Sequence, residues 1–349
     1  MRYINSLTGL RGLAAFIVFI SHCANQGMLP SIFGNGFGQI GVMLFFILSG
    51  FLMGHLYLDK EASPESIKLY LLARAGRIAP LYILLILLSV VISTGVYENF
   101  HYHITEPQIV LRALLFIDAP YEFWTIPVEV QFYAVFIGFW ILYRRNTSAW
   151  LLTVFIALTA VPSLILYPRL GHVPALFSSY SFPFFVGIGT AILYPRMAGS
   201  PALKNLAAYA ALPAVIALSL NLPAVRFEHN WIIDSHLFLR TWADPINWIV
   251  VYAVFCCAML NAKSLRFLNT RPLVLLGEIS FGFYLIHYPI IKIVKNLGIP
   301  LPLQFLSSLI VVGLMAWYSY QYFEKPANKL VREKLQGSPA RQTGYRKHA

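Results

Sequence analysis

Charged residues are scarce in this chain. Only 11% of its 349 residues are Asp, Glu, Lys or Arg, whereas 58% are hydrophobic. A soluble domain contains about 25% charged and about 45–50% apolar residues. The composition therefore excludes a soluble enzyme, a disordered protein and a fibrous protein. It indicates an all-α, polytopic membrane protein.

Cysteine is rare as well. Three cysteines are too few for a disulfide scaffold, and Cys256 and Cys257 are chain neighbours, a spacing that suits no metal site. We therefore expect no metal site.

Acidic residues are outnumbered by basic ones. The chain has 14 Asp and Glu against 26 Lys and Arg, a formal net charge of +12. In a soluble protein this excess would suggest a nucleic-acid partner. In a membrane protein, Lys and Arg flank the spans on the cytoplasmic side, so we expect contact with the lipid bilayer and no nucleic-acid partner.

Hydropathy predicts about ten membrane-spanning helices, each of which needs roughly 20 apolar residues. The stretch 105–118 is short and contains Arg112, so we expect an amphipathic or re-entrant segment there. Most basic residues fall on the side of the N-terminus, which predicts that both termini are cytoplasmic. The expected spans are 8–26, 38–57, 79–97, 124–143, 149–167, 176–195, 206–222, 246–261, 273–293 and 302–322.

Two ionisable residues lie in the first expected span. Arg11 and His22 are about three helical turns apart, so both project from one face and are separated by roughly 16 Å along the axis. Arg11 falls near the inner surface, and His22 lies deep, towards the outer leaflet. Each is either structural, an arginine that reaches the interface and a histidine bonded to a neighbouring helix, or part of a functional site.

Two further titratable side chains are expected at the depth of His22. Glu129 lies roughly one to two turns below the outer surface, where a carboxylate needs a proton, a cation or a histidine partner. His287 lies about 21 Å into the ninth span at helical rise. Similar depth in three spans favours a shared site, although a structural hydrogen bond between helices would also explain Glu129. Neighbours on these helix faces, by spacings of three and four residues, are Thr125, Ser280 and Tyr284.

Small and basic residues suggest where a ligand could enter. Ser49 and Gly50 fall in mid-membrane in the second span, where they allow either close helix packing or the passage of a linear ligand. Arg74 and Arg77 lie at the inner end of the third span. They are either positive-inside flanking residues or, together with Arg11, a phosphate clamp, because the forked guanidinium binds phosphate.

Six short motifs follow one another between residue 5 and about residue 330. They are 7–15 (LTGLRGLAA) followed by His22, 45–51 (FFILSGF), Arg74 and Arg77 with 80–82 (PLY), 124–125 (WT) with 129–133 (EVQFY), 280–287 (SFGFYLIH) and 323–326 (FEKP). Singly these motifs are weakly specific. In this order the chain resembles the membrane acyltransferase-3 family, which includes bacterial O-antigen, capsule and Nod-factor O-acetyltransferases.

The resemblance implies one transmembrane acyltransferase domain over residues 5–330, in the inner or plasma membrane, followed by a basic and disordered cytoplasmic tail at 331–349. It implies transfer of an acyl group, most often acetyl, from a cytoplasmic acyl-CoA to a hydroxyl of a glycan or lipid-linked saccharide. Such an acceptor would be a cell-envelope or exported polysaccharide. Acetyl-CoA is then a donor substrate and not a resident cofactor.

The resemblance also gives the candidate residues expected roles. The donor would bind with its CoA phosphates on Arg11, Arg74 and Arg77 and with its pantetheine arm along Ser49. His22 would act as the general base for the acceptor hydroxyl or carry the acyl group covalently.

The other candidates would support this chemistry. Glu129 would orient His22 and stabilise its charged form, and His287 is the rival base. The residues expected to bind the acceptor or support the site are Trp124, Thr125, Ser280 and Tyr284.

Two other functions remain open. A proton-coupled secondary transporter would use His22, Glu129 and His287 as a relay. It predicts paired broken helices and an internal repeat, and neither is evident in the sequence. A non-catalytic polytopic subunit of an envelope assembly would leave these three ionisable residues without a role.

Overall fold

The computed structural model describes residues 4–145, 177–220, 241–242 and 244–336. Within those ranges the chain forms helices joined by turns and contains no β-strand, which confirms the predicted all-α class. The fifth expected span, 149–167, lies outside the described residues, as does 337–349 of the expected tail.

The N-terminal half supplies most of the helices around the site. α1 (Asn5–Asn25) and α2 (Phe37–Tyr57) match the first two expected spans closely. α3 (Pro64–Gly95) starts well before the expected 79–97, because Ser63 caps it by accepting from the backbone N–H of Ser66 (3.2 Å) and proline takes the first helical position. The other elements are η1 (Ser31–Phe33), α4 (Pro107–Leu114), η2 (Tyr121–Trp124) and α5 (Thr125–Arg144).

The C-terminal half completes the bundle. Its elements are α8 (Phe177–Gly199), α9 (Pro201–Leu220), α12 (Pro245–Met259), η3 (Lys263–Asn269), α13 (Arg271–Glu278), α14 (Ser280–Lys295), α15 (Leu301–Ser319), the π-helical turn η4 (Tyr320–Glu324) and α16 (Lys325–Gln336). The stretch 105–118 contains the short helix α4, with Leu111 exposed, as expected for an amphipathic segment. α16 continues into residues that the sequence assigns to the tail.

The ninth expected span, 273–293, is not the single helix that the hydropathy suggests. α13 and α14 meet at 81°. At the bend the carbonyl of Gly277 accepts side-chain hydrogen bonds from Arg11 Nε (3.0 Å) and Ser280 Oγ (2.9 Å). A Cβ added to Gly277 would lie 1.9 Å from the carbonyl oxygen of Thr8. The absence of a side chain therefore lets α13 lie directly on α1, and α14 turns away from there.

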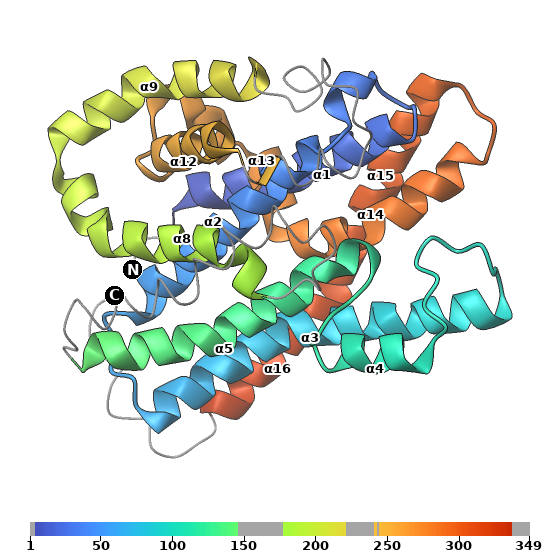
Figure 1. Ribbon diagram of the computed structural model, residues 1–349, viewed down its shortest axis with the longest axis horizontal. Helices are drawn as coiled ribbons and strands as arrows, with labels where there is room; N and C mark the ends of the chain where they lie inside the picture. The colour runs from blue at the N-terminus through green and yellow to red at the C-terminus, as the bar shows by residue number, and fades with distance from the viewer. Residues whose placement is uncertain (1–3, 146–176, 221–240, 243, 337–349) are drawn as a thin grey trace.

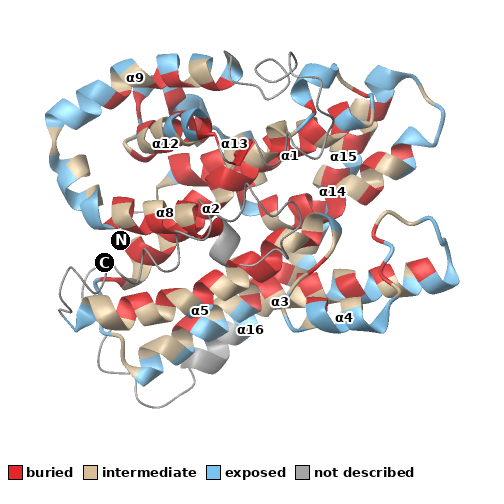
Figure 2. Ribbon diagram, in the orientation of Figure 1, coloured by how far each residue is buried: buried red, intermediate tan, exposed pale blue. Residues whose placement is uncertain are grey.

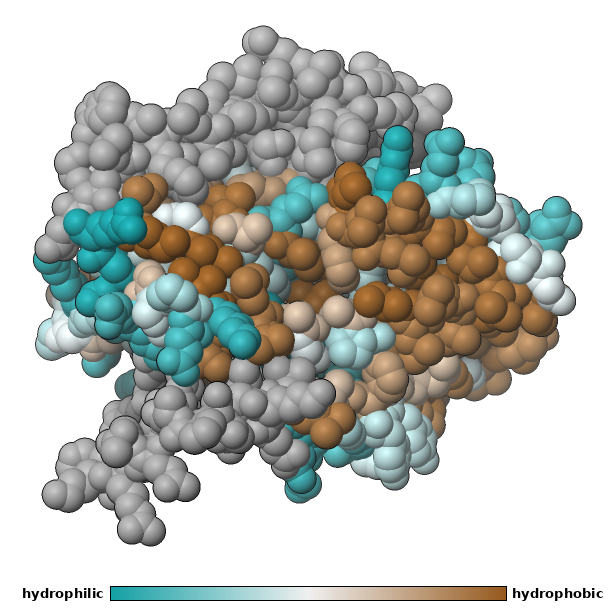
Figure 3. Space-filling model, turned by 90° about the horizontal axis from the view of Figure 1, so that it is seen from below, coloured by the Kyte–Doolittle hydropathy of each residue, from teal (hydrophilic) through white to brown (hydrophobic). Residues whose placement is uncertain are grey.

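Within the described residues, six helices are long and apolar enough to cross a membrane. The number is up to eight if each of two bent pairs, α12 with η3 (76°) and α13 with α14 (81°), is one span. The chain is thus a multi-pass membrane protein, while the count of about ten spans and the cytoplasmic termini stay predictions. Large apolar side chains cover its outside, including Leu87 and Val91 on α3 and Ile310 on α15, and Figure 3 shows such a hydrophobic surface on one face.

α1 and α2 run through the middle of the molecule (Figure 1). α8, α9 and α12 lie on one side of them, and α3, α5 and α16 lie on the other. Buried residues gather on the central helices, whereas α4 and α9 present long exposed faces (Figure 2). The site is therefore built where the central pair meets α3, α5 and α14.

Glycine lets α2 and α8 approach closely. A Cβ on Gly50 would lie 2.0 Å from the carbonyl oxygen of Phe184, and one on Gly187 would lie 2.2 Å from that of Ile47. The close-packing interpretation therefore holds for Gly50. The adjacent Ser49 points to a different neighbour, α5, and lines a cavity.

Candidate functional site

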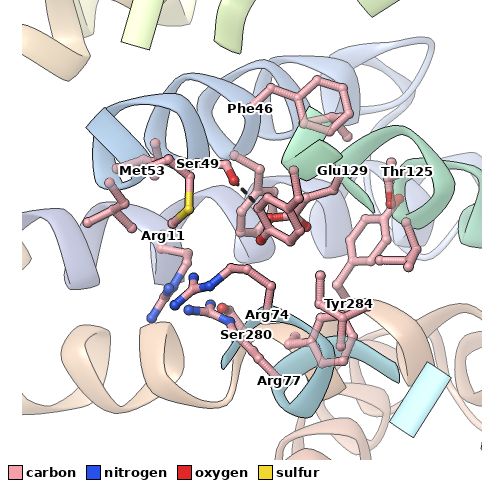
Figure 4. A pocket seen from close by; sticks show the side chains of 18 residues that line it. Arg11, Phe46, Ser49, Met53, Arg74, Arg77, Thr125, Glu129, Ser280 and Tyr284 are labelled. Atoms are coloured by element: carbon pink, nitrogen blue, oxygen red, sulfur yellow. Dashed lines mark hydrogen bonds between the residues drawn. The ribbon is translucent and has the colours of Figure 1, made fainter. Parts of the chain in front are cut away.

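A cavity lies between α1, α2, α3, α5 and α14 and encloses about 740 Å³, counting the space at its open mouth. We call it the arginine cavity because three arginines line it (Figure 4). Most residues that the sequence assigned to the donor and the support of the site are brought together here. They are Arg11, Ser49, Arg74, Arg77, Thr125, Glu129, Ser280 and Tyr284.

The three arginine side chains gather at one end of this cavity (Figure 4). Arg11 is held by its hydrogen bond to the carbonyl of Gly277. The guanidinium carbon of Arg74 lies 5.9 Å from the centre of the Tyr133 ring, and its buried Nε has no hydrogen-bond partner. A buried N–H without a partner costs about 1–3 kcal/mol, so this end of the cavity is suited to an anion.

A second cavity adjoins the arginine end. It encloses about 1420 Å³ with its open space and shares Arg11, Arg74, Arg77 and Phe281 with the arginine cavity. Its other residues are Ala73, Glu278, Tyr320, Glu324, Lys325, Asn328 and Lys329. This basic vestibule gives the arginines access to the surface at the N-terminal end of α1.

Glu129 is bound by neutral donors and not by the histidine that the sequence suggested. Its Oε1 accepts from Ser49 Oγ (2.9 Å) and from the Tyr133 hydroxyl (2.6 Å). The expectation that Glu129 partners His22 is thus corrected. The physical reason is the 3₁₀ turn η2, which precedes α5 and carries Glu122, seven residues before Glu129, to within 3.9 Å of His22 Nδ1.

The two predicted histidines form a direct pair. His22 Nδ1 lies 2.8 Å from His287 Nε2, and His287 Nδ1 is hydrogen-bonded to the backbone carbonyl of Tyr284. A carbonyl only accepts, so in the neutral pair His287 carries its proton on Nδ1 and its Nε2 is an acceptor. His22 must then donate from Nδ1, which leaves the Nε2 of His22 without a proton and available as a base.

Glu122, which is not among the residues that the sequence analysis singled out, lies beside this pair. Its Oε1 lies 3.9 Å from His22 Nδ1, and its Oε2 lies 2.9 Å from His101 Nε2. The ring of Tyr288 contacts both His22 and His101, at centroid distances of 4.5 and 4.1 Å. Glu122 and Glu129 are two helical turns apart, a spacing that could have pointed to both acids. No sequence signal marked His101.

Hydrogen bonds tie this cluster to α14. The Tyr284 hydroxyl donates to the backbone carbonyl of Glu122 (3.0 Å), and the Tyr102 hydroxyl donates to that of Leu285 (3.0 Å). Burial raises the pKa of Tyr102 well above its ordinary value, so the hydroxyl keeps the proton that it donates. The loop that carries His101 is thereby fixed to the helix that carries His287.

A third cavity, of about 1050 Å³ with its open space, has His22 in its wall. We call it the polar cavity because most of the side chains that line it are neutral and can form hydrogen bonds. They are Ser21, Asn25, Ser31, Asn35 and Gln39, beside His22, Ala24, Gly36 and Gly38. It shares no lining residue with the arginine cavity.

The remaining candidate, Trp124, belongs to an aromatic cluster. Its ring lies 4.7 Å from that of Tyr180 and 6.1 Å from that of Phe46 between centroids, and it is not among the residues that line the arginine cavity. In the described part of the chain, no group of three or more His, Cys, Asp or Glu side chains is placed to hold a metal ion.

Comparison with known proteins extends over almost the whole chain. YrhL of Bacillus subtilis, provisionally named a peptidoglycan O-acetyltransferase, is 25% identical over 364 residues, covering 93% of this chain and 55% of the relative. O-acetyltransferase OatA of Staphylococcus aureus is 23% identical, covering 94% and 58%, and peptidoglycan O-acetyltransferase OatA of Listeria monocytogenes is 22% identical, covering 94% and 56%. The chain thus spans just over half the length of these relatives.

A family model decides between the functional classes that the sequence left open. No solved structure matches the chain, but the model described as "Acyltransferase domain" matches residues 4–320. That range includes the arginines, the histidine pair and both glutamates, and it gives no support to the transporter alternative. The sequence resemblance is confirmed, and the chain belongs to this acyltransferase family.

Proposed function

We propose that the chain is an integral-membrane O-acyltransferase that moves an acetyl group from cytoplasmic acetyl-CoA to a hydroxyl of a cell-envelope glycan, in the inner or plasma membrane. The names of the relatives, which are peptidoglycan O-acetyltransferases, favour a peptidoglycan-type or lipid-linked saccharide as the acceptor. The observation that carries the proposal is a pair of cavities along α1. The arginine cavity extends from Arg11 to Tyr284, one helical turn before His287, and the polar cavity has His22 in its wall.

The donor would bind with its phosphates among the arginines. The unpartnered Nε of Arg74, beside Arg11 and Arg77, offers donors to an anion, and guanidinium groups bind phosphate oxygens in pairs. The thin pantetheine arm would run past Ser49 towards Tyr284. The basic vestibule would hold the nucleotide end, where Lys325 and Lys329 add positive charge.

The chemistry would use the free nitrogen of His22. Nε2 takes the proton of the acceptor hydroxyl as the oxygen attacks the thioester carbonyl, and the CoA sulfur leaves with the electron pair of the C–S bond. The imidazolium then returns the proton to the sulfur, which restores the neutral base. In this direct route no acetyl group is attached to His22, whereas the covalent alternative would acetylate it. Glu129 would hold Ser49 and Tyr133 in the wall of the donor cavity.

The acceptor would enter from the polar cavity. His22 lies in its wall, and the tautomer that the His287 contact favours leaves Nε2 as the reactive nitrogen. Neutral amide and hydroxyl side chains such as Gln39 and Asn25 suit the hydroxyls of an uncharged sugar ring better than a charged ligand. Donor and acceptor would therefore reach the reacting atoms from opposite ends of α1.

The test is acetyl transfer by the purified full chain in proteoliposomes. The reaction contains radiolabelled acetyl-CoA and a soluble N-acetylglucosamine–N-acetylmuramic acid oligomer or an undecaprenyl-linked disaccharide. We expect label on the saccharide as an ester that mild base releases, and none with His22→Ala. Recovery of all label as acetyl-CoA, with every saccharide unlabelled, would reject the proposed function. Base-stable label on His22 would replace direct transfer by the covalent route.

A further inference from the structure

We propose that Glu122, oriented by His101, is the acidic positioning residue of the site, which holds His22 and stabilises the imidazolium formed when His22 accepts a proton. The inference rests on the proposed function, in which His22 is the base. It assigns to Glu122 the role that the sequence gave to Glu129. Glu122 acts through His22 and contacts neither substrate.

The geometry of the carboxylate supports this role. His101 Nε2 holds one oxygen at 2.9 Å, and the other oxygen then lies 3.9 Å from Nδ1 of His22. The side chain of Glu122 is 14% exposed and that of His22 is 18% exposed, so little water screens their interaction. Among the described residues, Glu122 is the one carboxylate within 4.0 Å of a nitrogen of His22.

The surrounding contacts keep the carboxylate in place. The backbone of Glu122 is bound to α14 through the Tyr284 hydroxyl, and the ring of Tyr288 packs on both His22 and His101. The same helix provides His287, which accepts from Nδ1 of His22. Both neighbours of the Nδ1 edge are therefore fixed by one helix, which leaves the Nε2 edge free for the proton of the acceptor.

The charged and titratable groups around His22 come from three elements. α14 contributes His287, which contacts His22 directly. It also contributes Tyr288, whose hydroxyl accepts from Gln26 Nε2. Lys295 Nζ, on the same helix, donates to Gln26 Oε1 at 3.3 Å. η2 contributes Glu122, and the loop before α4 contributes His101 through Glu122. Of these groups Glu122 alone brings a negative charge, so its removal is expected to disfavour the protonated form of His22.

The first test measures protonation without any turnover. Diethylpyrocarbonate modifies neutral imidazoles, and mass spectrometry of the full chain in nanodiscs would give the pH at which His22 is half-reactive. In Glu122→Gln we expect this midpoint to fall by about one pH unit relative to the wild type, because the anion that favours imidazolium is lost. The exposed His103 on the same loop is the internal reference, and Glu106→Gln, at an exposed acid nearby, is the matched control that leaves the midpoint unchanged.

The second test is kinetic. Glu122→Gln is expected to lower kcat by about 10²-fold while the KM for acetyl-CoA stays the same, and Glu122→Asp to retain part of the rate. In a His22→Ala background, Glu122→Gln should lower the residual rate no further, because residues that act as a unit are non-additive. A purely structural role would lower the rate in both backgrounds.

Each outcome separates this inference from the proposed function. An unchanged midpoint in folded Glu122→Gln would overturn the inference, even if the wild type transfers acetyl groups. A lowered midpoint in a wild-type protein that transfers nothing would keep the Glu122–His22 pairing and reject the function. If Glu122→Gln does not fold, His101→Gln frees the carboxylate from its hydrogen bond instead. That variant should lower the midpoint by a smaller amount, and an unchanged midpoint would then overturn the inference.

Discussion

The role proposed for His22 follows from what its two nitrogens contact. Nδ1 meets His287 and Glu122, no described residue forms a hydrogen bond with Nε2, and the side chain lies in the wall of the polar cavity. A histidine that is fixed on one edge and free on the other has the arrangement of a general base with a partner behind it. His287 is 1% exposed and has both nitrogens engaged, so it is better suited to hold His22 than to replace it.

Removal of the His22 ring should therefore abolish most turnover. General-base catalysis contributes about 10²–10⁴-fold, and we expect His22→Ala to lower kcat by that factor while the KM for acetyl-CoA changes little. The measurement is steady-state acetyl transfer at matched amounts of monodisperse protein, with His103→Ala as the control at an exposed histidine. A near-normal kcat in His22→Ala would show that His22 is not the general base.

Arg74 should affect the donor and not the chemistry. A charge-assisted contact to phosphate is lost in Arg74→Ala, so we expect the KM for acetyl-CoA to rise about tenfold or more, with partial recovery in Arg74→Lys, which keeps the charge but not the fork. Isothermal titration with coenzyme A checks binding directly. Arg112→Ala, at an exposed arginine on α4, is the control. If all variants bind coenzyme A with equal affinity, Arg74 does not bind the donor and is only a positive charge that flanks the span.

At the scale of residues, the sequence indicated the members of the site better than their partners. Arg11, His22, Glu129 and His287 could be found because an ionisable group inside a span is costly and therefore rare. Depth along separate helices could not show that Glu129 faces Ser49 while Glu122 faces His22. Which of the two acids lies beside His22 depends on the 3₁₀ turn that precedes α5, and a hydropathy profile does not reveal such a turn.

At the scale of elements, the bend between α13 and α14 positions both the arginine end of the site and the histidine pair against α1. It presents the carbonyl of Gly277 to Arg11 at one end, and it aims His287 at His22 three turns further along α1. Hydropathy found the apolar length of this segment correctly, since both helices are apolar. It could not find the bend, because the cause is a backbone contact between Gly277 and Thr8, which are far apart in the chain.

A methyl group at the bend should therefore be harmful. In Gly277→Ala the new Cβ would meet the Thr8 carbonyl at 1.9 Å, and the resulting shift of α13 should cost about 1–3 kcal/mol and displace Arg11. We expect a lower melting temperature in detergent and a raised KM for acetyl-CoA. Gly313→Ala is the matched control, because nothing lies within 4 Å of its Cβ on the face of α15. Equal behaviour of the two variants would contradict a structural role for the bend.

At the scale of the whole molecule, the arginine end and the polar cavity should lie on opposite sides of the membrane. In a protein whose three native cysteines have been replaced, Lys60→Cys should react with a membrane-impermeant maleimide only after the cells are permeabilised. In the same background, His103→Cys should react with the maleimide in intact cells. This outcome follows from the excess of basic residues on the side of the N-terminus. Labelling of both positions from one side would require a new topology.

The all-α class and the multi-pass character could be predicted because composition and hydropathy report them directly. The shape of the interior could not. Which side chains line one cavity depends on how α2, α5 and α14 cross α1. Those crossings are set by small residues such as Gly41, where an added Cβ would lie 2.4 Å from the carbonyl oxygen of Ala14, and by turns between helices.

The separation of the two cavities has an energetic consequence for the cell. They approach from opposite ends of α1 without sharing a lining residue. The rings of Phe45 and Tyr284, in edge contact at 6.2 Å, both line the arginine cavity, and the Tyr284 ring lies 5.7 Å from that of His287. A continuous water path there would let protons run down the transmembrane potential, which amounts to about 2.3 kcal/mol per charge at 100 mV. If the donor is a cytoplasmic thioester and the acceptor lies outside, as proposed, aromatic side chains between the two cavities would allow acetyl transfer without such a water path.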